Sequence, residues 1–227
     1  MKVIKLPKKI KALVFDMDLT LYSNPEYGRT QIDNLVAIAG EKRGLSFEQA
    51  NAEIDAIRKS YAMSHNGKKP SLSGIILSWG FTMEENIAWR EKAYEPEKFL
   101  DVDTRLRGTL LSLSRYSLGV VTNNPVSIAN RTLVCLGIED CFSAVCGLDT
   151  LMIAKPHKLP FLKMLEMLNV HNGNDPDKFI EPESAISIGD RYEIDLEIPL
   201  EMGMGAILVD GVEDVYDLPE LLEKNHE

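Results

Sequence analysis

Short apolar runs recur along the chain, once near its start and several times in its second half. The first is Ala12–Phe15, residues 118–121 form another, and residues 185–188 are apolar apart from Ser187. The segments 144–146 and 206–209 have the same apolar character. Short continuous runs of this kind are typical of strands that are buried on both faces. The pattern therefore predicts a sheet that is covered on both sides.

Apolar positions at helical spacing occupy the stretches between these predicted strands. The predicted helices of the second half are residues 104–115, 127–136, 160–168 and 195–202. Alternating helices and strands indicate a parallel sheet with right-handed crossovers, so we expect an α/β fold with helices on both faces. The polar segment 171–182 is predicted to be a surface loop, and 217–227 a short terminal helix.

The interval between residues 22 and 103 has a helical pattern without predicted strands. Apolar residues recur there three and four positions apart, as in Ile32, Leu35, Val36 and Ala39. The polar segment 65–70 predicts a break between helices. We therefore expect an α/β core of residues 1–21 and 104–227, interrupted after its first strand by an all-helical cap of residues 22–103.

Composition and charge exclude several classes of partner. The chain has 227 residues, of which 44% are hydrophobic, and a formal net charge of −10. An acidic protein is a poor general binder of nucleic acids or anionic membranes, because both reward a basic surface. No stretch approaches the apolar length of a membrane span, and the basic segment 1–11 lacks the apolar core of a signal peptide. We expect a cytoplasmic protein, a monomer or small homo-oligomer, with neither nucleic-acid nor membrane partners.

The cysteines indicate neither a disulfide framework nor a zinc site. The chain has three, Cys135, Cys141 and Cys146, without a Cys-x-x-Cys pair, and four scattered histidines. This favours reduced thiols, and no histidine has the spacing of a zinc ligand. We expect Cys135 and Cys146 to be small core residues rather than nucleophiles.

Two carboxylates follow directly where the first predicted strand ends. Asp16 and Asp18 stand one residue apart, with the hydroxyl of Thr20 two positions further on. Carboxylates this close suit Mg²⁺, which prefers hard oxygen ligands. A carboxylate beside a metal ion can also attack phosphorus and form an aspartyl phosphate. An acidic turn after a strand is the ordinary alternative, so the interpretation depends on partners elsewhere in the chain.

Such partners follow in order along the chain. Thr122 and Asn123 follow the second predicted strand, and Lys155 directly precedes a proline. Asp190 follows the third predicted strand, with Asp195 five residues further on. A phosphoryl-transfer site needs a nucleophile, hydrogen-bond donors for the phosphate oxygens and cations against the accumulating charge. Each residue alone has an ordinary structural explanation, but together, at the ends of strands, they predict one phosphoryl-transfer site.

This set of motifs resembles that of the haloacid dehalogenase superfamily of aspartate-nucleophile phosphatases. The matching residues are Asp16, Asp18 and Thr20, then Thr122, then Lys155, then Gly189 and Asp190 with Asp195. The family usually has Asn, Gly or Asp where this chain has Leu19. A weaker resemblance, over 20–22 and 136–142, is to the pyrimidine 5′-nucleotidase-like branch. The fold implied is a Rossmann-like parallel sheet core with a helical cap above its catalytic edge.

The resemblance also implies an activity, a cofactor and a role for each residue. The protein would be a Mg²⁺-dependent phosphatase that acts on a small phosphate monoester, such as a nucleotide or a sugar phosphate. Asp16 would be the nucleophile, and Asp18 would protonate the leaving oxygen and then activate water. Mg²⁺ would bind Asp16, the backbone carbonyl of Asp18, and Asp190. The other implied roles are charge neutralisation by Lys155, phosphate contact by Thr122 and Asn123, support of the loop by Thr20, and orientation of Lys155 or metal-bound water by Asp195.

Three alternatives use the same fold. A phosphomutase would return the phosphoryl group to its substrate, and its motifs would be identical. A non-catalytic phosphometabolite-binding module would be expected to lack at least one catalytic group. A dehalogenase uses no metal and typically lacks the second aspartate, so Asp18 and Asp190 argue against it. The leaving group is expected to contact the cap, whose candidate residues are Tyr22, Arg29, Tyr61, Lys68 and Trp79.

Overall fold

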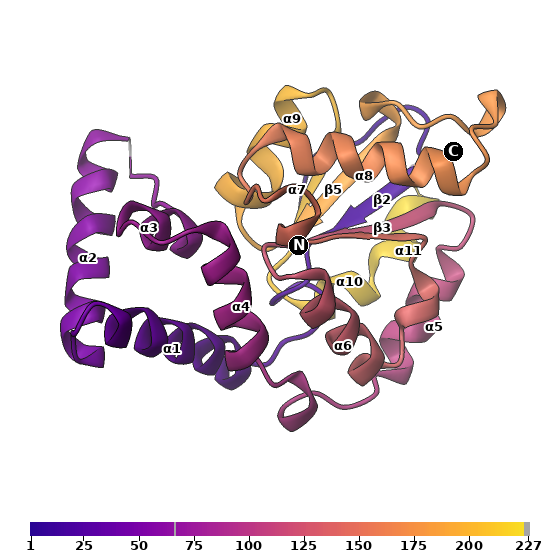
Figure 1. Ribbon diagram of the computed structural model, residues 1–227. Coiled ribbons are helices and arrows are strands. Elements are labelled where there is room, and N and C mark those ends of the chain that lie inside the picture. Colours follow the sequence, from indigo (N-terminus) through magenta and orange to yellow (C-terminus); the bar gives the residue numbers. More distant parts are fainter. Residues whose placement is uncertain (66, 225–227) are drawn as a thin grey trace.

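The computed structural model of the chain describes residues 1–65 and 67–224. Within these residues, one six-stranded sheet has the order β1-β6-β5-β2-β3-β4. Its strands β2, β3 and β5 are labelled in Figure 1. The strands are β1 (Lys2–Lys5), β2 (Ala12–Phe15), β3 (Ser117–Val121), β4 (Ala144–Cys146), β5 (Ala185–Gly189) and β6 (Gly205–Leu208). Strands β2 to β6 run parallel, and β1 pairs with β6 in the antiparallel direction. The predicted parallel α/β sheet is confirmed, with one additional edge strand.

The edge strand β1 is a strand that the pattern of apolar residues did not predict. Its sequence is Lys-Val-Ile-Lys, which has only two consecutive apolar residues, and three of its four residues are exposed. Pairing with β6, in which Val3 lies opposite Ile207, holds it in the sheet. Backbone pairing of this kind leaves no periodic trace in the sequence, because it does not depend on buried side chains.

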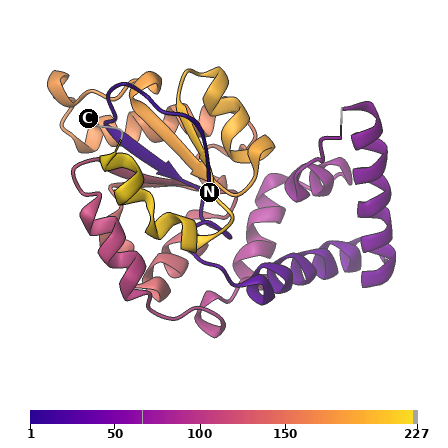
Figure 2. The same cartoon turned by 180° about the vertical axis from the view of Figure 1, so that it is seen from behind.

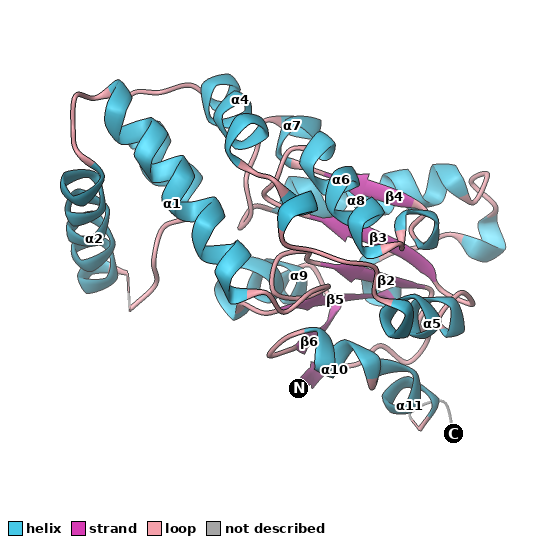
Figure 3. Cartoon of the chain, turned by 90° about the horizontal axis from the view of Figure 1, so that it is seen from below, coloured by secondary structure: helices cyan, strands magenta, loops and turns pink. Residues whose placement is uncertain are grey.

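Helices cover both faces of the sheet, because alternate residues of a strand point to opposite sides. Leu13 and Phe15 pack in one apolar cluster with α5, α6, α10 and α11, whereas Ala12 and Val14 pack in another with α8. The helices of this core are α5 (Thr104–Ser112), α6 (Val126–Leu136), α7 (Leu148–Leu151), α8 (Lys158–His171), α9 (Glu197–Glu201), α10 (Val212–Tyr216) and α11 (Leu218–Glu223) (Figure 3). The predicted placement of helices on both faces is therefore confirmed.

Three predicted segments differ in detail from the observed elements. The predicted loop 171–182 includes a 3₁₀ turn, and the predicted helix 195–202 is α9 preceded by a π-helical turn at Tyr192–Leu196. The terminal helix is α11, and residues 225–227 lie outside the described residues. The 3₁₀ turns of the structure are Pro96–Lys98, Glu139–Cys141, Pro176–Lys178 and Pro182–Ser184.

The described residues between β2 and α5 form a group of helices beside the sheet (Figures 1 and 2). They are α1 (Pro25–Lys42), α2 (Phe47–Ser64), α3 (Leu72–Ser78) and α4 (Met83–Ala93). Ser46 and Thr82 begin α2 and α4 with reciprocal capping hydrogen bonds to Gln49 and Glu85. None of the helices in the described part of the chain has the length and apolar character needed to cross a membrane.

These helices contribute to two further apolar clusters, one of which also includes Ile128 of α6. One includes Leu35, Ile76 and Trp89, and another includes Val36, Ile54 and Ile75. Trp79 is partly buried against both clusters, and the guanidinium of Arg43 lies 4.5 Å from its ring centre. The two tryptophans of the chain therefore pack within this helical group.

Candidate active site

The register of the central strands brings the predicted residues to one edge of the sheet. Phe15, at the end of β2, lies opposite Val120 of β3 and Ile188 of β5. The residues that follow these strands therefore meet at the same edge, and the backbone N–H of Asp16 still donates to the Ile188 carbonyl, 2.8 Å away. The carboxyl edge of an open α/β sheet is where ligands bind in such folds.

Lys155 joins two of the predicted carboxylates. Its Nζ donates to Asp16 Oδ1 at 2.5 Å and to Asp195 Oδ1 at 2.7 Å, and its side chain is almost completely buried. Burial alone would lower the pKa of Lys155, but the charges of Asp16 and Asp195 raise it above its ordinary value. The raised pKa favours the charged ammonium, which is held against the candidate nucleophile.

The side chain of Asn123 positions Lys155. Its Nδ2 donates to the backbone carbonyl of Lys155 at 3.1 Å, and its Oδ1 accepts from the backbone N–H of Lys155 at 2.7 Å. Both polar atoms of the Asn123 side chain are thus hydrogen-bonded to Lys155. If Asn123 contacts phosphate, its backbone N–H would make that contact. The neighbouring Thr122 is buried, and its Oγ1 accepts from the backbone N–H of Asn124, which leaves the hydroxyl hydrogen available for donation.

Three carboxylates form a cluster that suits a divalent cation. Oxygens of Asp16, Asp190 and Asp195 all lie within 4.8 Å of one another. Both oxygens of Asp195 are occupied, by Lys155 and by the backbone N–H of Arg191. Oδ2 of Asp16 and Oδ1 of Asp190 are buried and have no hydrogen-bond partner among the described residues. Orphaned carboxylate oxygens are hard donors, so Asp16 and Asp190 fit Mg²⁺ and Asp195 fits a supporting role.

The electrostatics of Asp190 agree with a cation at this position. Burial, followed by the charge of Asp16, raises the pKa of Asp190 to about 7. A bound divalent cation would favour the ionised carboxylate instead. Gly189 is required beside it, because a Cβ at that position would lie 2.5 Å from the Cβ of Asp195.

Asp18 occupies a different environment from Asp16. The hydroxyl of Tyr22 donates to its Oδ1 at 2.6 Å, and Asn124 Nδ2 lies 3.1 and 2.9 Å from its two oxygens. Burial, and then the charge of Asp16, raises the pKa of Asp18. Two neighbouring carboxylates with different environments are the arrangement that lets one attack and the other carry a proton.

Thr20 lies buried in the loop that carries both aspartates. Its backbone N–H donates to the carbonyl of Met17 at 3.2 Å, and its Oγ1 has no hydrogen-bond partner among the described residues. The structure therefore places Thr20 inside the loop rather than at the surface of the site.

Leu19 has a backbone conformation that does not suit its side chain. Its φ of 59° is in the left-handed region, where most residues with a Cβ are strained, whereas Gly has no Cβ and Asn and Asp tolerate the conformation better. This gives a physical reason for the residues that the resembling family usually has at this position.

Replacing Leu19 with Asn should therefore raise the free energy of unfolding by about 1 kcal/mol, because Asn tolerates this φ better. Chemical denaturation of both proteins measures the difference. The control is Leu162→Asn, which changes a similarly exposed leucine within helix α8 and should destabilise. Equal destabilisation by both substitutions would contradict the strain at Leu19.

Tyr22, Asn124 and Arg90 surround Asp18, and two of them were missed by sequence reasoning. Tyr22 was a candidate for leaving-group contact, but its hydroxyl serves Asp18 and accepts from Gln31 of α1 at 3.2 Å. Asn124 was visible as the second amide after the β3 strand, although no role was predicted for it. An arginine within a helix, such as Arg90 in α4, carries no signal in the sequence that separates it from a solvated side chain.

A hollow of about 1390 Å³ opens above Asp18 and Asp190. Among the described residues that line it are seven Lys and Arg and four Asp and Glu, in a chain with a net charge of −10. Arg29 and Lys68 line it, as predicted candidates, and Lys68 pairs with Glu197 at 2.7 Å. Tyr61 and Trp79 are not among its described lining residues, and Tyr61 stacks on His65 instead. The hollow therefore has the charge that an anionic ligand needs.

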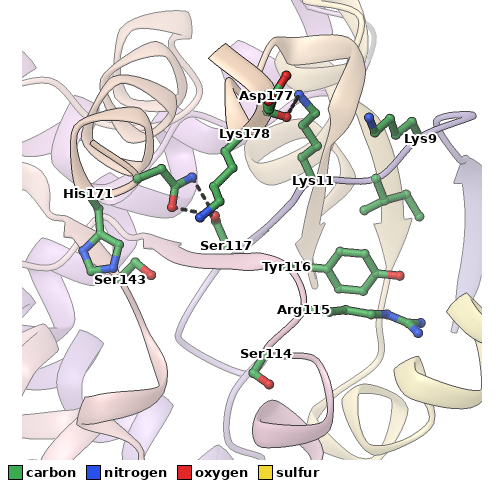
Figure 4. A pocket seen from close by; sticks show the side chains of 12 residues that line it. Lys9, Lys11, Ser114, Arg115, Tyr116, Ser117, Ser143, His171, Asp177 and Lys178 are labelled. Carbon is green, nitrogen blue, oxygen red and sulfur yellow. Dashed lines mark hydrogen bonds between the residues drawn. The ribbon is translucent and has the colours of Figure 1, made fainter. Parts of the chain in front are cut away.

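A second hollow, of about 420 Å³, lies at the opposite edge of the sheet (Figure 4). Ser117 begins β3 there, and Lys11 precedes β2. Lys11 Nζ donates to the backbone carbonyls of Asp177 and Phe179 at 3.1 and 2.7 Å. None of the predicted site residues is among the described residues that line this hollow, and Lys11 is used to hold a loop.

The cysteines lie outside the site. Cys146 is buried beside α8, and Cys135 and Cys141 are partly buried, all three as free thiols. Burial raises the pKa of each thiol, which disfavours the reactive thiolate.

Comparison with known proteins identifies relatives along most of the chain. A family model described as haloacid dehalogenase-like hydrolase matches residues 13–209. A phosphoglycolate phosphatase of Psychrobacter arcticus is 33% identical over 78% of this chain and 74% of its own length. A glyceraldehyde 3-phosphate phosphatase of Methanopyrus kandleri is 27% identical over 88% of this chain and 84% of its own. The crystal structure of a HAD phosphatase from Thermococcus onnurineus matches 94% of this chain and 98% of its own, with a TM-score of 0.60 and 23% identity.

Proposed function

Since the chain belongs to the haloacid dehalogenase-like hydrolases, we propose that it hydrolyses small phosphate monoesters through an aspartyl phosphate on Asp16, with Mg²⁺ as cofactor. The observation that carries this proposal is the pair of neighbouring carboxylates with different surroundings. Asp16 is paired with the ammonium of Lys155, whereas Asp18 is partly buried, has no cationic hydrogen-bond partner among the described residues, and has a raised pKa. Such a pair can supply a nucleophile and a proton donor in one reaction.

The proposed reaction has two steps. The Asp16 carboxylate attacks phosphorus, the bond to the leaving oxygen breaks, and protonated Asp18 gives its proton to that oxygen. In the second step, ionised Asp18 takes a proton from a water molecule that attacks the aspartyl phosphate. This releases inorganic phosphate and regenerates Asp16, and the proton returns Asp18 to its starting state.

The remaining side chains would hold the phosphate and the metal ion. Asp16 and Asp190, with the backbone carbonyl of Asp18, would bind Mg²⁺, which supplies positive charge to the phosphate oxygens. The Thr122 hydroxyl would donate to the phosphate, and Lys155 would neutralise it. Asp195 would orient Lys155, to which it is hydrogen-bonded.

The hollow supports a proposal for the class of substrate. Its excess of Lys and Arg favours anionic metabolites, and the names of the relatives point to phosphorylated compounds of two or three carbons. We propose that residues 22–103 act as a cap over the core of 1–21 and 104–227 and contact the leaving group. Arg29, Arg90 and Tyr94 come from that segment and line the hollow.

Removal of metal should abolish the activity. The protein is expected to hydrolyse p-nitrophenyl phosphate and several short phosphate esters in the presence of Mg²⁺, to lose turnover in EDTA, and to regain it with excess Mg²⁺. Equal turnover in EDTA would contradict the metal assignment. No turnover of any ester in a broad panel would instead favour a non-catalytic binding module. Release of inorganic phosphate, rather than an isomer of the phosphorylated substrate, separates the phosphatase from a phosphomutase.

A further inference from the structure

Arg90 of α4 is a buried cation without an ion-pair partner among the described residues. Only 6% of its surface is exposed, and no carboxylate of the described residues lies within 4.0 Å of its guanidinium. Its hydrogen-bond acceptors are all neutral: Ser73, Asn86, Tyr94 and Asn124. Lys155, the other buried cation described above, has two carboxylate partners. Asp18 interacts electrostatically with Arg90, but it lies beyond ion-pair distance. A buried charge is costly unless an opposite charge accompanies it closely, so a further anion beside Arg90 would be stabilised.

The guanidinium also retains hydrogen-bonding capacity. Nε donates to Asn86, Nη1 donates to Tyr94 and Asn124, and Nη2 donates to Ser73. Arginine has five N–H groups, so one N–H of Nη2 has no acceptor among the described residues. Arg90 and Ser73 both line the hollow above Asp18. A ligand bound in the hollow would therefore be in a position to accept this hydrogen bond.

The position of Arg90 relative to Asp18 limits the size of that ligand. Asn124 bridges the two, because its Nδ2 contacts both Asp18 oxygens and its Oδ1 accepts from Arg90 at 3.3 Å. The side-chain amide of Asn124 thus lies between the guanidinium of Arg90 and the carboxyl group of Asp18, which is proposed to protonate the leaving oxygen. A leaving group that reaches both would have only a few atoms between its ester oxygen and its acceptor.

We propose that Arg90 binds a carboxylate on the leaving group, so that the preferred substrates are short phosphorylated hydroxy acids. The proposal rests on the proposed function, in which Asp18 acts at the leaving oxygen. A carboxylate would supply both the missing negative charge and the missing acceptor. The planar guanidinium matches the two oxygens of a carboxylate, and hydrogen bonds between charged groups are the strong ones. An uncharged aldehyde or alcohol of the same length would leave Arg90 without a counter-charge.

A different role for Arg90 makes a different kinetic prediction. If it only holds Asn124, and through it Asp18, then its loss should reduce turnover of every substrate by the same factor. If it binds a substrate carboxylate, the loss should be concentrated on substrates that have one. Two esters of equal chain length, 2-phosphoglycolate and 2-hydroxyethyl phosphate, separate these roles because they differ chiefly in the charge of the far end.

The test compares kcat/KM for the two esters in the wild-type protein, in Arg90→Gln and in Arg90→Lys. The wild type should prefer 2-phosphoglycolate by about 10-fold or more. Arg90→Gln should lower kcat/KM for this ester by about 10- to 100-fold, and lower that for 2-hydroxyethyl phosphate much less. Arg90→Lys keeps the charge but lacks the planar guanidinium, so its kcat/KM for 2-phosphoglycolate should lie between those of the wild type and Arg90→Gln. The matched control is Lys92→Gln, an exposed cation on the same helix, which should leave both values unchanged.

Equal losses on both esters in Arg90→Gln would overturn the proposal in favour of a purely positioning role. The wild-type protein tests the proposal even if Arg90→Gln does not fold. Equal kcat/KM values for 2-hydroxyethyl phosphate and 2-phosphoglycolate would show that a substrate carboxylate gains nothing from Arg90 and would overturn the proposal. Failure to turn over either ester or p-nitrophenyl phosphate would instead overturn the proposed phosphatase function.

Discussion

Asp16→Asn should abolish phosphatase turnover, lowering kcat by at least about 10⁴-fold. An amide is a poor nucleophile, and Asn cannot form the acyl phosphate through which the reaction is proposed to pass. The substitution also removes the charge that Lys155 contacts at 2.5 Å, so the pair and the nucleophile are lost together. Single-turnover assays with p-nitrophenyl phosphate measure the loss without interference from product release.

The control is Asp101→Asn, which removes an exposed carboxylate and should change neither kcat nor KM. A melting curve of Asp16→Asn separates loss of chemistry from loss of the fold. Turnover by folded Asp16→Asn close to the wild-type rate would show that another group attacks phosphorus.

Asp18→Asn is expected to lower kcat by about 10²- to 10⁴-fold, the range typical of general acid–base catalysis. Asn has the same shape as Asp, and its Oδ1 can still accept from Tyr22 and Asn124, so the substitution is not expected to move Asp16. The amide can neither protonate the leaving oxygen nor activate water. With p-nitrophenyl phosphate, whose leaving group needs little protonation, the second step should suffer more than the first.

The distinctive result for Asp18→Asn is therefore an accumulated aspartyl phosphate. Acid quenching followed by mass spectrometry should find the protein with one added phosphoryl group. The double variant Asp16→Asn/Asp18→Asn provides the control and should acquire none. An adduct in the double variant would place the phosphoryl group on a residue other than Asp16.

The central part of the fold could be predicted because burial leaves a clear pattern in the sequence. Strands β2 and β5 are buried at every position; in the sequence β2 is a continuous apolar run, and β5 is apolar apart from Ser187. The polar residues just beyond them were predicted to meet, and the parallel register does bring Asp16 and Asp190 within reach of each other. Local sequence is sufficient here because the ends of parallel strands share one edge.

The surroundings of Asp18 could not be predicted in the same way. Tyr22, Arg90 and Asn124 come from three separate segments, and their contacts depend on how the helices pack against the edge of the sheet. Sequence spacing does not report which face of α4 turns toward the hollow, because α4 has no strongly apolar side. The backbone conformation of Leu19 was hidden for a related reason, since a leucine gives no sign of a left-handed φ.

The two outermost strands of the sheet, β1 and β4, have a consequence for how copies of this chain can associate. Unpaired strand edges can recruit a strand of another molecule and so lead to aggregation. One edge here is β1, whose exposed Lys2 and Lys5 would repel the same strand of a second copy, and the other is β4, which has only three residues. Both edges thus discourage continuation of the sheet from one molecule to the next. Any stable self-association of the protein is therefore expected to use its helical surfaces.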